Sequence, residues 1–122
     1  MSRSVISNQN IFEYAVSHST PPDGVLQELI DETRELTGGA AGMQIGADQG
    51  AFMTILSGSL RPRFAVEVGT FTGYSSICIA RGLAPEGKLL CCDVSEEWTD
   101  IAQRYWSKAN LSDKIDLVLA PG

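Results

Sequence analysis

Two glycines, Gly69 and Gly73, lie in the stretch Val-Glu-Val-Gly-Thr-Phe-Thr-Gly-Tyr-Ser-Ser, which follows an apolar run and precedes a helical pattern. Glycine is needed where the backbone turns with a positive φ angle or comes close to a ligand. The N–H groups at the start of the following helix suit a carboxylate or another anion, and Ser75 can add a hydroxyl donor. The G-x-x-x-G spacing differs from the G-x-G-x-x-G motif that brings a helix under a pyrophosphate. The pattern therefore favours a cofactor without phosphate.

Two carboxylates accompany this turn. Asp93 ends the next apolar run, and because ligands of open α/β sheets lie outside the carboxyl ends of the strands, it can accept hydrogen bonds from both hydroxyls of a ribose. Glu67 lies just before the turn, where its charge favours a sulfonium or an amine and repels a phosphate. Each of these residues also has a purely structural interpretation. The glycines can simply form a turn, Asp93 can be an acid at a helix start, and Glu67 can pair with a protein donor.

A strand and helix pattern that would position these residues begins near residue 62. The elements expected in order are a strand over 64–68, a helix over 75–81, a strand over 88–93, a helix from Ser95 to about Asn110 and a strand over 115–119. Strands that alternate with helices and are nearly continuous in apolar character predict a parallel sheet with right-handed crossovers. We expect an α/β fold with strand order 3-2-1, which forms the first half of a doubly wound sheet and leaves the first strand with an unpaired edge.

The residues before 62 predict helices. Apolar residues at helical spacing indicate a short helix around 12–16, a second from Asp23 to the Gly38-Gly39 pair, and a third from Asp48 as N-cap to Gly58. Between the last two, residues 43–46 have no obvious regular structure. We therefore interpret residues 1–122 as one domain, with a helical part over 1–61 and a β-α-β-α-β part over 62–122.

Composition narrows the classes of function. A chain of 122 residues with 43% hydrophobic residues fits one soluble domain, and its net charge of −6 argues against nucleic acid as a partner. The apolar runs are too short to cross a bilayer and the N-terminus does not resemble a targeting segment, so we expect a cytoplasmic protein. Three cysteines without metal spacing and a single histidine, His18, provide neither a zinc site nor a histidine triad.

Four motifs in order, MQIGADQGAFM, FAVEVGTFTGYSS, GKLLCCDVSEEW and KIDLVLAPG, resemble the caffeoyl-CoA and catechol O-methyltransferase family from Met43 to Gly122. Members of that family are cation-dependent enzymes with a Rossmann-like methyltransferase fold. They transfer methyl from S-adenosylmethionine to a phenolic hydroxyl. The resemblance implies the same fold, the same cofactor, a small phenolic or catechol-type acceptor and a homodimer. The expectation that neither nucleic acid nor membrane is a partner rests on the composition.

The resemblance also implies roles for single positions. Glu67, Gly69, Thr70 and Gly73 would line the methionine and ribose part of the cofactor, with Ile45 beside them. Ser75 would contact the cofactor carboxylate, and Asp93 would bind the ribose hydroxyls. Met43 would border the substrate, and the adenine would lie against Ala120, Pro121 and Gly122. The family has Gly-Pro-Ala where this chain has Ala-Pro-Gly, so this chain departs from the family pattern at the adenine contact.

The family's divalent cation, normally magnesium, is bound by an aspartate on the next strand and a later Asp-Asn pair. None of those positions exists in this sequence, so we expect no metal ligand and name no catalytic residue. The chain would then be the front half of an O-methyltransferase whose C-terminal half is missing. One alternative is a non-catalytic cofactor-binding or assembly module. Another is a nicotinamide-dependent oxidoreductase, which shares the strand-turn-helix plan but not the glycine spacing.

Overall fold

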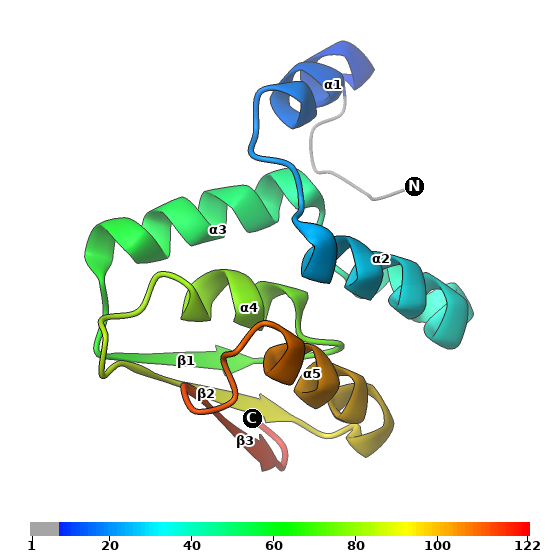
Figure 1. The fold of residues 1–122 in the computed structure, drawn as a ribbon. Coiled ribbons are helices and arrows are strands. Elements are labelled where there is room, and N and C mark those ends of the chain that lie inside the picture. The colour runs from blue at the N-terminus through cyan, green and yellow to red at the C-terminus, as the bar shows by residue number, and fades with distance from the viewer. Residues whose placement is uncertain (1–7) are drawn as a thin grey trace.

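The computed structural model describes residues 8–122 of the chain (Figure 1). Its elements in order are α1 (Gln9–Ser17), α2 (Gly24–Thr37), the 3-10 helix η1 (Gly38–Met43), α3 (Ala47–Leu60), β1 (Phe64–Val68), α4 (Tyr74–Ala80), β2 (Lys88–Asp93), α5 (Glu96–Lys108) and β3 (Ile115–Leu119). The three strands begin and end at the residues expected from the apolar runs. The structure is therefore α/β, as the sequence predicts.

Side-chain caps fix where several helices begin. The Asp23 carboxylate accepts a hydrogen bond from the Leu26 N–H at the start of α2. The Ser95 hydroxyl does the same for the Trp98 N–H at the start of α5, whose first turn carries two glutamates that favour the helix dipole. Because these caps are local sequence signals, both helices begin where the sequence predicts.

Two details of the helical part differ from the prediction. Asp48 is not the N-cap of α3, because the helix begins at Ala47 with Gly46 as the cap residue, and Asp48 lies in the first turn. Gly58 does not end α3, which continues to Leu60 and stops where Arg61 adopts a left-handed conformation. The segment expected to be irregular is also partly helical, since η1 extends to Met43.

The sheet is parallel, in the order β1-β2-β3, which is the predicted order 3-2-1 seen from the other end. Val68 lies opposite Cys92 in the register of β1 with β2, and Asp93 lies opposite Leu119 in the register of β2 with β3. The carboxyl ends of all three strands therefore meet at one edge of the sheet. That edge therefore carries residues 69–73 after β1, Asp93 at the end of β2 and the segment after Leu119.

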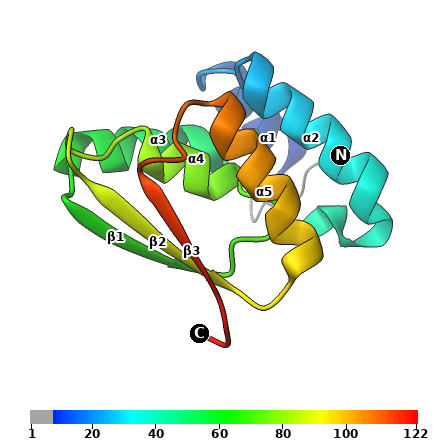
Figure 2. The ribbon, with the colours of Figure 1, turned by 60° about the horizontal axis from the view of Figure 1, so that its bottom comes forward.

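The helices lie on one face of the sheet (Figure 2). Leu89 and Cys91 of β2 are fully buried under this layer and belong to the same core as Ile77 of α4, Ala102 of α5 and Leu29 of α2. Burial of one such aliphatic side chain contributes about 1.5–3 kcal/mol, so this shared core fixes α4, α5 and α2 against the strands.

The opposite face of the sheet carries exposed apolar side chains. Phe64, Val66 and Val68 of β1 point away from the helical layer and are 54–67% exposed, and Val118 of β3 is 43% exposed. Side chains alternate between the two faces of a strand, so these residues form a continuous apolar surface with the outward positions of β2. Among the helices described over residues 8–122, none has the length and apolar character needed to cross a bilayer.

Candidate functional site

Residues 69–73, called the bend below, connect β1 to α4 and contain both glycines that the sequence singled out. Gly69 and Gly73 adopt φ angles of +90° and +92°, which L side chains rarely adopt. The surroundings of the two differ. A Cβ atom on Gly73 would lie 2.8 Å from Ala102 Cβ and from Trp106 Nε1, whereas nothing lies within 4 Å of a Cβ on Gly69. Gly73 is thus required by packing, and Gly69 leaves open space at the pocket side of the bend.

Phe71 lies at the centre of the bend with a φ angle of +51°, an uncommon conformation for an aromatic residue. Its side chain is 8% exposed and packs edge to face on Trp98 of α5, with ring centroids 4.9 Å apart and planes at 84°. Such aromatic pairs contribute about 0.5–1.5 kcal/mol beyond their buried area, which offsets part of a backbone strain of about 1–3 kcal/mol. The shape of the bend is therefore maintained by α5.

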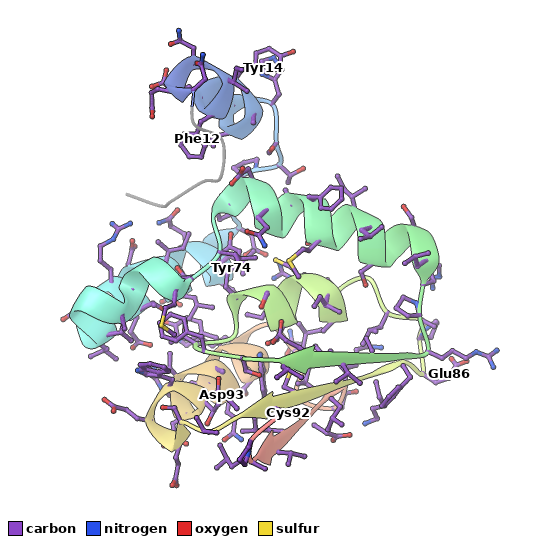
Figure 3. The ribbon with its side chains drawn as sticks, turned by 180° about the vertical axis from the view of Figure 1, so that it is seen from behind. Phe12, Tyr14, Tyr74, Glu86, Cys92 and Asp93 are labelled. Carbon is purple, nitrogen blue, oxygen red and sulfur yellow. The ribbon has the colours of Figure 1, made fainter. Side chains whose placement is uncertain are left out.

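Asp93 closes the bend from β2. Its Oδ2 accepts hydrogen bonds from the N–H groups of Thr70 at 2.9 Å and Phe71 at 2.8 Å, and its Oδ1 accepts from those of Val94 at 2.6 Å and Ser95 at 3.0 Å. Burial disfavours the charge, but the four N–H groups outweigh it and lower the pKa of Asp93 below its usual 3.8. The carboxylate is therefore ionised near neutral pH and faces the bend, as the sequence argument requires (Figure 3).

Those four bonds bear on the predicted ribose contact. A carboxylate has about four lone-pair sites, and protein N–H groups occupy all of them here. Ribose hydroxyls would therefore share or replace the bonds from Thr70 and Phe71. The structural interpretation of Asp93 and the functional one thus apply to the same atoms, and the ribose role stays a prediction.

Glu67 is paired within the protein. Its two carboxylate oxygens accept hydrogen bonds from Ser75 Oγ at 2.5 Å and Ser76 Oγ at 2.6 Å, and the Cys91 thiol lies 3.8 Å from Oε1. Burial raises the pKa of Glu67 above its ordinary 4.5, although these hydrogen bonds oppose the shift. The partner that a buried carboxylate needs is thus supplied by α4. Because its hydroxyl proton is directed at Glu67, Ser75 presents acceptor lone pairs and a backbone N–H to a ligand.

A small pocket opens between the bend and the segment after η1. Its lining combines one side of the bend with residues that precede α3: Met43, Gln44, Ile45, Gly69, Thr70, Phe71, Thr72, Tyr74 and Ser75. The Thr70 hydroxyl is buried and has no hydrogen-bond partner among the described residues. Buried polar atoms are normally paired, so the Thr70 hydroxyl is an exception in the wall of this pocket.

The last predicted residues reach the same edge of the sheet. The Ala120 N–H donates to the Asp93 carbonyl oxygen at 2.9 Å. A Cβ atom on Gly122 would lie 2.5 Å from Val68 Cγ1, so the backbone after β3 crosses close to the end of β1. The structure therefore places Ala120 and Gly122 near Asp93 and the bend. It does not test whether residues 120–122 contact an adenine.

No group of three or more metal-ligating side chains is found within residues 8–122, and we assign none of them to a cation. The described residues fit S-adenosylmethionine better. Open space at Gly69, the unpaired Thr70 hydroxyl and the ionised Asp93 lie along one edge, as a cofactor with a polar amino-acid end and a ribose requires.

Sequence reasoning missed one set of residues at this site. Thr33 of α2, Gln44 and Thr72 of the bend form hydrogen bonds to one another, of which the one between the two threonines is buried and those from Gln44 are partly buried. One signal was available, because Thr33 falls at helical spacing from Leu26 and Leu29, where the core-facing side of α2 requires an apolar residue. A polar residue in such a position indicates a buried partner.

Comparison with known proteins identifies a family for this chain. A family model described as O-methyltransferase matches residues 16–122. A probable caffeoyl-CoA O-methyltransferase 2 from Dictyostelium discoideum is 35% identical over 114 residues, which cover 93% of this chain and 49% of the relative. A catechol O-methyltransferase from Mycobacterium tuberculosis is 30% identical over 77 residues, which cover 63% of this chain and 35% of that protein.

Solved structures agree with the fold. The O-methyltransferase from Bacillus cereus in complex with SAH superposes with a TM-score of 0.80 at 29% identity, covering 89% of this chain and 49% of that one. The Streptomyces achromogenes O-methyltransferase involved in tomaymycin synthesis, in complex with SAM, gives a TM-score of 0.78 at 26% identity, covering 88% and 48%. This chain spans about half the length of the relatives it matches.

Proposed function

The chain belongs to the O-methyltransferase family, and from that premise we propose that it contributes the S-adenosylmethionine-binding part of an enzyme that methylates a phenolic or catechol-type hydroxyl of a small molecule. The observation that carries this proposal is the closed contact between Asp93 and the bend. It brings the two sequence signals for the cofactor, which lie 23 residues apart, into one site.

Each group at this edge has a distinct part in the proposal. Gly69 lets the cofactor approach the backbone, the Thr70 hydroxyl gains a partner, and Asp93 orients the ribose while its charge attracts a sulfonium. Ser75 receives the amino-acid end with its lone pairs and N–H group. When bound, the cofactor supplies an electrophilic methyl group on sulfur. The chain's own residues hold it in place and leave the acceptor to approach from the side of Met43.

Further parts of the proposal rest on the family alone. We propose that residues 1–122 fold as one domain, that the enzyme works as a homodimer in the cytoplasm, and that a divalent cation, bound outside this chain's described residues, assists the acceptor hydroxyl. Residues 120–122 would border the adenine, and Ile45 would lie beside the methionine end.

Isothermal titration of the intact gene product with S-adenosylmethionine tests the proposal. Saturable binding with one site per chain is expected, and Asp93→Ala is expected to weaken it at least tenfold, because the variant loses both the charge and the closed bend. Methyl transfer to catechol with magnesium is the second measurement. Absence of cofactor binding by the parent would end the proposal, and cofactor binding without turnover on any phenolic acceptor would favour the non-catalytic module.

A further inference from the structure

Three polar side chains from separate segments, two of them from residues that line the pocket, form what we call the Thr33–Gln44–Thr72 cluster. The hydroxyl oxygens of Thr33 and Thr72 lie 2.9 Å apart, and these side chains are 0% and 1% exposed. Gln44 Nε2 donates to Thr33 Oγ1 at 3.1 Å and to Thr72 Oγ1 at 3.4 Å. The cluster therefore links α2, the segment after η1 and the bend.

The three hydrogen bonds of the cluster can form at the same time. A glutamine amide has two N–H donors, and each threonine hydroxyl can donate once and accept twice. One N–H can thus go to each hydroxyl, while one hydroxyl donates to the other. In this arrangement the nitrogen of the Gln44 amide is directed at the two threonines.

Gln44 is flanked by two residues that line the pocket, Met43 and Ile45. Met43 is the last residue of η1, and Gln44 and Ile45 lie between η1 and α3. The backbone hydrogen bond that Gln44 itself donates goes to Ala41 of η1 at 3.1 Å, not to the bend. The Gln44 side chain connects this segment to the bend through a hydrogen bond to Thr72. The position of the pocket wall relative to the bend therefore depends on the cluster.

The pocket includes Ser75 but not Asp93, so its wall lies over the end of the site away from the ribose acid. We infer that Gln44 is a positioning residue, which through Thr33 and Thr72 holds residues 43–45 as the wall over the methionine end of the bound cofactor. This inference rests on the proposed function. It predicts that the cluster affects ligands that carry the amino-acid end and spares ligands that lack it.

Gln44→Leu separates these two effects. The variant removes both amide donors but leaves the bond between Thr33 and Thr72, so the buried hydroxyls remain paired. For the intact gene product, we expect the dissociation constant of S-adenosylhomocysteine to rise about tenfold, or about 1.4 kcal/mol. We expect that of 5′-methylthioadenosine, which lacks the amino-acid end, to stay within about twofold. Gln27→Leu, which changes an exposed glutamine of α2, is the matched control and should change neither.

The Thr33 variants decide the outcome if Gln44→Leu does not fold. Thr33→Ser keeps the hydroxyl and should bind both ligands as the parent does, whereas Thr33→Val should weaken the amino-acid ligand selectively. Unchanged S-adenosylhomocysteine binding in Gln44→Leu and Thr33→Val would overturn the inference, as would an equal loss of both ligands, which would indicate a general loss of stability. A parent protein that binds neither ligand would instead contradict the proposed function and the inference with it.

Discussion

Replacing Asp93 with asparagine tests how far one carboxylate maintains the bend. The parent side chain accepts four backbone N–H groups, two from the bend and two from the start of α5. In Asp93→Asn one of the two oxygens becomes an NH₂ group, which cannot accept. Whichever way the amide turns, either the pair from Thr70 and Phe71 or the pair from Val94 and Ser95 loses its acceptor.

The expected loss follows from those two bonds. A hydrogen bond to a charged group contributes about 1.5–3 kcal/mol, and the low end applies because Asp93 is partly exposed and water can reach the released N–H groups. Two bonds at that value give a decrease of about 3 kcal/mol in the free energy of unfolding. Asp116→Asn, at an exposed position of β3, is the matched control and should change the free energy by less than about 0.5 kcal/mol.

Urea unfolding followed by circular dichroism at several pH values measures this loss. The folded-state pKa of Asp93 lies below 3.8, so its contribution is fully present above that pH and disappears as pH falls through the lowered value. The difference between parent and variant should therefore be constant from pH 7 to about pH 5 and shrink below pH 4. A difference that is absent at pH 7, or equally large at pH 3, would refute the assignment of these bonds to the ionised carboxylate.

Two other predictions concern the glycines and the buried acid. In urea unfolding, Gly73→Ala should lower the free energy by about 3 kcal/mol, because a Cβ atom would contact Ala102 and Trp106 in a strained backbone, whereas Gly69→Ala should cost about 1 kcal/mol from strain alone. Equal losses would contradict this packing argument. The raised pKa of Glu67 means that its carboxyl favours the folded state below pH 4.5 and loses that advantage as pH rises, so the stability of Glu67→Gln relative to the parent should grow between pH 4 and pH 7. A flat or falling difference would show that Glu67 titrates normally.

The strands could be predicted from the sequence because each is a short apolar run between polar or turn residues. The segment Lys88–Asp93 is bounded by a Pro-Glu-Gly turn and by Ser95, so the strand ends are defined locally. The predicted start of α3 is two residues too late because Asp48 has a side chain suited to an N-cap, yet Gly46 occupies that position without a side-chain hydrogen bond. Gly58 is not a stop signal because a single interior glycine costs a helix only about 1 kcal/mol, and α3 continues through it to Leu60.

The site could be predicted only in part. The position of Asp93 beside the bend follows from parallel strand order, since neighbouring strands bring their carboxyl ends together. The two serine donors of Glu67 and the Thr33–Gln44–Thr72 cluster could not be predicted, because they depend on how α4 and α2 rotate about their axes. That rotation is set by side-chain packing across 39 residues of sequence in the case of Thr33 and Thr72.

The contact between Phe71 and Trp98 means that the bend is a tertiary structure and not a local one. A peptide that ends before β2 contains both glycines and the serines of α4, but it lacks the Trp98 ring that stabilises Phe71 in its left-handed conformation and the Asp93 carboxylate that binds the bend N–H groups. Such a peptide would sample many turn shapes and would have to lose that freedom on meeting a ligand. Within this fold the bend is instead formed once α5 packs, so the affinity of the site depends on a helix that lies beyond the next strand.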